Sequence, residues 1–162
     1  MRSILFALCF VNLGHAAIRP FSLLWINHPT PNTIFQSKDI PNAIFVIESF
    51  FNACPPCNQN APKVESLAEF YSNESRVHFL DVGVDRKKSE YQDWIRKHDP
   101  HHPVLMDSDQ LVNLQLGTEG YPSSYVLDCH GVVVAHTLGV WDEEATYSIK
   151  SAIDALLKTQ CE

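Results

Sequence analysis

The chain has 162 residues, enough for one domain with a sizeable core, so it does not need disulfides to fold. Its formal net charge of −7 argues against nucleic acid as a partner, because the densest basic run, Arg86-Lys87-Lys88, is too short to form a phosphate-binding face. Beyond the N-terminus, no segment of the sequence is apolar enough to span a membrane.

The first 16 residues have the pattern of a signal peptide. Met1-Arg2 gives a short positive start, Ile4 to Leu13 is almost wholly apolar, and Gly14-His15-Ala16 supplies the small residues of a cleavage site. The apolar run is shorter than the roughly 20 residues that cross a bilayer, which disfavours the alternative of a retained anchor. We therefore predict that residues 1–16 are removed and that the protein is exported.

Residues 17–42 are predicted to form an N-terminal extension. They are interrupted by prolines and asparagines, and apolar residues cluster only at 21–26 and 34–35, which indicates one or two short strands. The pattern changes at Ala43, where residues 43–47 form a continuous β-branched and aromatic run typical of a central strand. A second, larger unit is therefore expected over residues 43–162.

Helices and strands alternate through that unit. Val64, Leu67, Ala68 and Tyr71 are spaced as one buried helical face, which predicts a helix over 61–71. Further along we expect strands at 77–84 and 103–106, and helices at 89–97 and 110–116.

The C-terminal part is predicted to be a hairpin followed by a helix. Two apolar runs at 125–127 and 132–135 flank Asp128-Cys129-His130-Gly131, and Gly131 suits a tight turn. A helix is expected at 142–157, with three acidic residues at its positive end. The fold class is therefore α/β, with a central mixed β-sheet flanked by helices.

Cys54-Pro55-Pro56-Cys57 lies between the central strand and the first helix. Two thiols at this spacing can close a disulfide, and a helix N-terminus favours the thiolate of the first. A structural disulfide or half a zinc site is the alternative, but the sequence holds no second Cys-x-x-Cys. Cys129 and Cys161 are the two cysteines that remain beyond residues 1–16, and their spacing does not decide whether they form a disulfide.

Three elements in order resemble the thioredoxin superfamily, and most closely its exported TlpA/ResA-type thiol-disulfide oxidoreductases. They are the Cys54–Cys57 motif, Pro62 in the helix that follows, and the segment 120–128, which is similar to the family's cis-proline loop and hairpin strand. The resemblance covers about residues 43–158. It implies a thioredoxin-like fold and Cys54 and Cys57 as the catalytic residues.

The resemblance also implies supporting roles. Cys54, nearer the surface, would attack a disulfide and Cys57 would resolve it. Pro122 would follow a cis bond and expose the Tyr121 backbone to an extended substrate, and Pro62 would kink the active-site helix. Glu48 matches the position of a buried acid, whose raised pKa suits a proton acceptor for Cys57. A solvated strand-end glutamate is the alternative.

Two departures from the family pattern are visible. Ala53 stands where an aromatic residue usually precedes the first cysteine, so the surface beside the thiol lacks a flat apolar contact for a partner. Asn60 replaces an acid of several relatives, so pH-dependent switching by that acid should be weaker.

The histidines of the loop after the second helix raise a separate question. His98, His101 and His102, with Asp99, could form a metal cluster, but Pro100 and Pro103 mark a loop in which histidines are usually solvated. We therefore expect no metal site there.

The resulting hypothesis is an exported thiol-disulfide oxidoreductase, acting as a reductase on protein substrates and needing no cofactor beyond its cysteine pair. A membrane reductase or a partner thiol protein would donate electrons, and the resemblance favours the periplasm over secretion or membrane tethering. The alternatives are a disulfide oxidase or isomerase, a non-catalytic interaction module with a static disulfide, and a copper-handling module.

Overall fold

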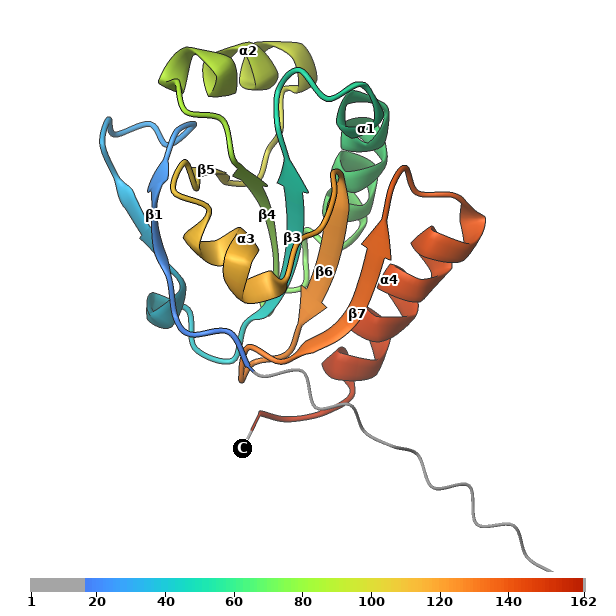
Figure 1. Ribbon diagram of the computed structural model, residues 1–162. Coiled ribbons are helices and arrows are strands. Elements are labelled where there is room, and N and C mark those ends of the chain that lie inside the picture. The colour runs from blue at the N-terminus through green and yellow to red at the C-terminus, as the bar shows by residue number, and fades with distance from the viewer. Residues whose placement is uncertain (1–16, 162) are drawn as a thin grey trace, which may run out of the picture.

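The computed structural model describes residues 17–161. A seven-stranded mixed sheet has the order β2-β1-β5-β4-β3-β6-β7, in which β3 runs parallel to β4 and antiparallel to β6 (Figure 1). The strands are β1 Ser22–Trp25, β2 Ile34–Gln36, β3 Ile44–Phe50, β4 Val77–Gly83, β5 Val104–Met106, β6 Ser123–Leu127 and β7 Val133–Leu138. The helices are α1 Pro55–Phe70, α2 Lys88–His98, α3 Leu111–Leu116 and α4 Glu143–Leu157, with a 3₁₀ turn at Ser37–Asp39.

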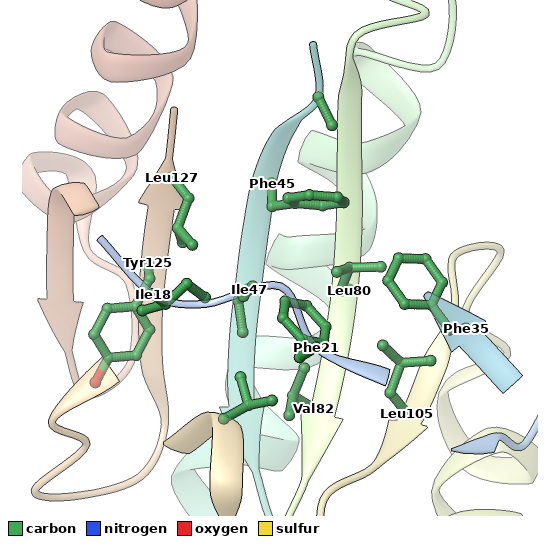
Figure 2. Close-up of a cluster of buried hydrophobic side chains, with 12 residues drawn as sticks. Ile18, Phe21, Phe35, Phe45, Ile47, Leu80, Val82, Leu105, Tyr125 and Leu127 are labelled. Atoms are coloured by element: carbon green, nitrogen blue, oxygen red, sulfur yellow. The ribbon is translucent and has the colours of Figure 1, made fainter. Parts of the chain in front are cut away.

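Helices cover both faces of the sheet. Alternate residues of β3 point to opposite sides, so Ile44 and Val46 pack with α1 and α4, whereas Phe45 and Ile47 pack with α3. Figure 2 shows the second of these clusters, in which aromatic and aliphatic side chains from the N-terminal segment, β3, β4, β5 and β6 meet. Every residue of β3 is buried, as expected of a strand covered on both faces. The predicted α/β architecture is confirmed.

The segment 17–42 is part of the sheet and of its core. It forms two short strands, where one or two were predicted, and β1 pairs antiparallel with both β2 and β5, so the segment adds two strands at one edge. Phe21 and Phe35 from this segment are buried beside Phe45 of β3 (Figure 2). The extension therefore contributes to the same hydrophobic core as the rest of the chain.

The hairpin between β6 and β7 is tied to the C-terminus. The Asp128 carboxylate accepts hydrogen bonds from the backbone N–H of His130 and Val132, and Gly131 has a φ of 79°, as the turn requires. Cys129 forms a disulfide with Cys161, with the two Cα atoms 6.2 Å apart. The pairing that the spacing left open is therefore formed.

The predicted signal peptide, residues 1–16, lies outside the described residues. Among the helices of residues 17–161, none combines the length and the apolar character needed to cross a membrane.

Candidate active site

The cysteine pair lies at the N-terminus of α1, beyond the end of β3. Cys54 is the N-cap residue, Pro55 and Pro56 occupy the first two helical positions, and Cys54 and Cys57 are joined by a disulfide. Prolines are tolerated there because the first helical N–H groups have no intrahelical acceptor. The Cys57 N–H donates to the Cys54 Sγ atom over 3.1 Å, so this amide is placed where it would stabilise a Cys54 thiolate.

The expectation that Cys54 lies nearer the surface than Cys57 is wrong for this disulfide form. Both residues are 1% exposed. They belong to a buried cluster with Phe50 and Trp94, against which the partly buried Phe51 and Tyr121 also pack. The Phe51 and Tyr121 rings meet edge to face with their centroids 5.6 Å apart. In the disulfide form, therefore, almost none of the Cys54 surface is open to an attacking thiolate.

The segment before β6 has the backbone form that the resemblance implied. The Tyr121–Pro122 peptide bond is cis, which confirms the expected cis-proline loop. Pro122 is buried, and its carbonyl accepts a hydrogen bond from the N–H of Gly139 over 2.8 Å. The loop is thereby fixed to the end of β7 beside the cysteine pair.

Pro62 lies inside α1, which continues through it to Phe70. Its neighbours Ala61 and Val64 are buried, so this part of the helix packs closely on the sheet. No break in the helix accompanies the proline.

Glu48 is buried, which rules out the alternative of a solvated strand-end glutamate. Its side chain is on β3 and the residue is 3% exposed. Its Oε1 atom accepts a hydrogen bond from Asn60 Nδ2 over 2.7 Å, and its Oε2 atom accepts one from the Ser124 hydroxyl. Burial raises the pKa of Glu48 to about 7, although both hydrogen bonds oppose this. The carboxyl group is therefore suited to proton exchange near neutral pH.

Asn60 links this carboxyl to the rest of the buried site. It is one helical turn after Cys57 on α1, and its Oδ1 atom accepts a hydrogen bond from the Trp141 N–H over 2.8 Å. The Trp141 indole donates to the Ser124 hydroxyl over 2.7 Å. Sequence reasoning missed Ser124 and Trp141, because polar residues in a predicted strand and in the loop before a helix give no signal of such a network.

The four residues of the histidine loop do not form one metal-ligand set among residues 17–161. His98 bonds to the Asn58 side chain, whereas His101 and His102 contact Glu65. His102 is 8% exposed, so the expectation of a solvated histidine is wrong at this position. A different grouping comes together, in which side-chain atoms of Glu65, Glu69 and His101 lie within 4.8 Å of one another. Exposed groups of this kind are common without a metal.

Comparison with known proteins agrees with this geometry. The sequence model of the Redoxin family matches residues 21–156. The chain is 27% identical over 92 residues to the thiol:disulfide interchange protein DsbE of Pseudomonas aeruginosa, covering 56% of this chain and 48% of that protein. It is 28% identical over 127 residues to the SUPPRESSOR OF QUENCHING 1 protein of Arabidopsis thaliana, covering 74% of this chain and 12% of that protein. The chain thus spans less than half the length of either relative.

Solved structures show the same fold. The crystal structure of a thiol:disulfide interchange protein of the thioredoxin family from Chlorobium tepidum superposes with a TM-score of 0.71 at 18% identity. The match covers 87% of this chain and 95% of that one. The thioredoxin-like fold expected from the sequence is confirmed.

Proposed function

Because this chain belongs to the Redoxin family, we propose that it is a thiol-disulfide oxidoreductase that exchanges disulfides with protein substrates through Cys54 and Cys57. The observation that carries the proposal is the geometry of the pair. The two cysteines form a disulfide at a helix N-terminus, and Tyr121 of the cis-proline loop packs against their cluster. One helical turn after Cys57, Asn60 bonds to the buried Glu48 carboxyl group, whose pKa is raised to about 7.

The reaction in the reducing direction has two steps. The Cys54 thiolate attacks one sulfur of a substrate disulfide, so that a mixed disulfide forms and the first substrate thiolate leaves. Cys57 then loses its proton to Glu48 and attacks the Cys54 sulfur, which releases the second substrate thiolate and closes the Cys54–Cys57 disulfide. The enzyme dithiol is oxidised by two electrons and the substrate disulfide is reduced by two. Tyr121 and Pro122 would hold an extended substrate segment beside Cys54.

The reducing direction is supported by the N-terminus of α1. Pro55 and Pro56 carry no N–H, so among the first three helical residues only Cys57 can donate to the Cys54 sulfur. A less stabilised thiolate corresponds to a more reducing couple. A Pro55→Gly variant restores one donor, and we expect its reduction potential to be less negative than that of the wild type. An unchanged or more negative potential would contradict this reasoning.

The remaining parts of the proposal concern place and partners. The protein would be exported to the periplasm, as the signal-like residues 1–16 suggest. A membrane reductase or a partner thiol protein would return electrons to the disulfide. The cysteine pair would be the only redox group that the reaction needs.

One observation favours a second candidate, a non-catalytic module with a static disulfide. Cys54 is buried in the disulfide form, as such a module requires. The two candidates differ after reduction, because an enzyme must then present its Cys54 thiolate to a substrate.

The test uses the full chain and a small protein with an accessible disulfide. We expect the reduced wild type to reduce that disulfide, Cys54→Ser to be inactive, and Cys57→Ser to accumulate a mixed disulfide through Cys54. Cys129→Ser is the matched control and should react like the wild type, because Cys129 lies in the hairpin turn and not at the N-terminus of α1. A wild type that leaves the substrate disulfide intact would favour the static module.

A further inference from the structure

A buried charged cluster lies under α1, outside the cysteine pair and the cis-proline loop. Asp81 of β4 has its Oδ1 atom 3.0 Å from His102 Nε2, and its Oδ2 atom accepts a hydrogen bond from Trp94 Nε1 over 2.8 Å. The other ring nitrogen of His102, Nδ1, lies 3.1 Å from Glu65 Oε2 on α1. The cluster thus connects β4, α1, α2 and the loop before β5.

His102 is held in its positively charged form by this arrangement. Each of its ring nitrogens faces a carboxylate oxygen, and a neutral imidazole would turn a lone pair toward one of them. The two contacts are ion pairs, in which the positive charge of the ring stabilises both carboxylates. Burial lowers the pKa of His102, but the charges and contacts of Asp81 and Glu65 together outweigh burial and raise it to about 10.

The cluster reaches the proposed proton acceptor through the register of the sheet. Glu48 and Asp81 are directly paired positions on the parallel strands β3 and β4. Paired positions on neighbouring strands, about 4.8 Å apart, point to the same face, so two buried carboxyl groups lie side by side. The charge of Asp81 raises the pKa of Glu48 and the charge of His102 lowers it, both as smaller effects than burial.

The other groups around Glu48 are mostly uncharged. α1 contributes Asn60, β6 contributes Ser124, and the Trp141 indole bonds to Ser124. One further cation and one further histidine lie nearby. Lys63 of α1 donates to the Trp141 carbonyl. Burial lowers the pKa of His98 of α2, although the charge of Asp81 opposes this. Among the described residues, His102 is the cation that contacts Asp81.

We propose that His102 is a positioning residue for thiol exchange, whose positive charge offsets Asp81 and so keeps Glu48 able to accept the Cys57 proton. This inference rests on the proposed function. In the resolving step the proton passes from the Cys57 thiol to the Glu48 carboxylate, the Cys57 thiolate attacks Cys54, and the bond between Cys54 and the substrate sulfur breaks. His102 exchanges no proton in this step and acts only through its charge.

The test is the pH dependence of the resolving step in the full chain, followed in a single turnover after the mixed disulfide has formed. His102→Gln leaves the Asp81 charge unopposed, so the midpoint of the pH profile should rise, by up to about one unit. Asp81→Asn removes the like charge and should lower the midpoint. The double variant D81N/H102Q removes both charges and should fall between the two single variants.

His101→Gln is the matched control. His101 is adjacent in sequence and contacts the same Glu65, with Nδ1 2.5 Å from Oε1, but it is exposed and does not contact Asp81. The pH midpoint of the His101→Gln variant should equal that of the wild type. If His102→Gln fails to fold, the comparison of Asp81→Asn with D81N/H102Q replaces it, and the double variant must have the higher midpoint.

A higher pH midpoint in His102→Gln and a lower one in Asp81→Asn support the proposal. A role in folding alone would not shift the two midpoints in opposite directions. An unshifted His102→Gln profile, or shifts of the same sign, would overturn it. A wild type that does not form or resolve a mixed disulfide would instead contradict the proposed function, so the two failures can be distinguished.

Discussion

Replacing Glu48 by glutamine should stabilise the oxidised protein at neutral and alkaline pH. The pKa of this buried carboxyl group is about 7 against an ordinary value of 4.5. Between these values the unfolded chain has lost the proton and the folded chain still holds it, so the free energy of unfolding falls as the pH rises. At about 1.4 kcal/mol per pKa unit, the loss amounts to about 3 kcal/mol once the pH is well above 7.

Glutamine is uncharged at every pH and is close to protonated glutamate in shape. It can still accept the Asn60 hydrogen bond and pair with Ser124. The two proteins should therefore be about equally stable near pH 4.5, and Glu48→Gln should be more stable by about 3 kcal/mol near pH 8.5.

The assay is urea unfolding of both oxidised proteins over this pH range, with equal m-values as the check that the comparison is valid. Titrations of the other groups largely cancel in the difference between the two proteins. A difference in unfolding free energy that does not change with pH would refute the burial argument for Glu48.

Three further changes have expected outcomes. Tyr121→Ala should make the reduced active-site thiol react several-fold faster with iodoacetamide, because the ring packs against the cluster that buries it; an unchanged rate would mean that the ring is not the barrier. Replacing Cys129 and Cys161 by serine should lower the urea-measured free energy of unfolding by about 3–4 kcal/mol, because the bridge closes a loop between residues 32 apart, and should leave thiol exchange unaltered. Gly83→Ala should cost about 1–3 kcal/mol, because its Cβ atom would lie 2.5 Å from a Tyr91 ring atom; unchanged stability in thermal unfolding would show that the ring moves away freely.

The order of helices and strands could be predicted from sequence because each has a strong local pattern. The β3 strand is an apolar run, α1 has a helical stripe, and the β6–β7 hairpin has its turn residues. The C-terminal end of β3 was harder to predict, because Glu48 and Ser49 are polar and nevertheless buried. Periodicity reports burial of apolar residues and does not detect a buried polar network.

Contacts between distant residues were not predictable in the same way. The pairing of β1 with β5 depends on strand order, and no local pattern encodes that order. His102 was expected to be solvated because prolines mark its loop, but the loop returns to Asp81 and Glu65, which are 21 and 37 positions away in the sequence. Likewise, Tyr121 packs against the buried cluster that contains Cys54, although it lies far along the sequence in the cis-proline loop.

We propose that Cys54 and Cys57 form a reversible redox couple of the reducing kind. The most direct measurement is the equilibrium reduction potential of this pair in the full chain, titrated against a thiol buffer with Cys129 and Cys161 replaced by serine. We expect a potential near that of thioredoxin, roughly −270 mV. A potential of roughly −120 to −180 mV would contradict the reductase assignment, and a disulfide that does not exchange with the buffer would contradict the catalytic account itself.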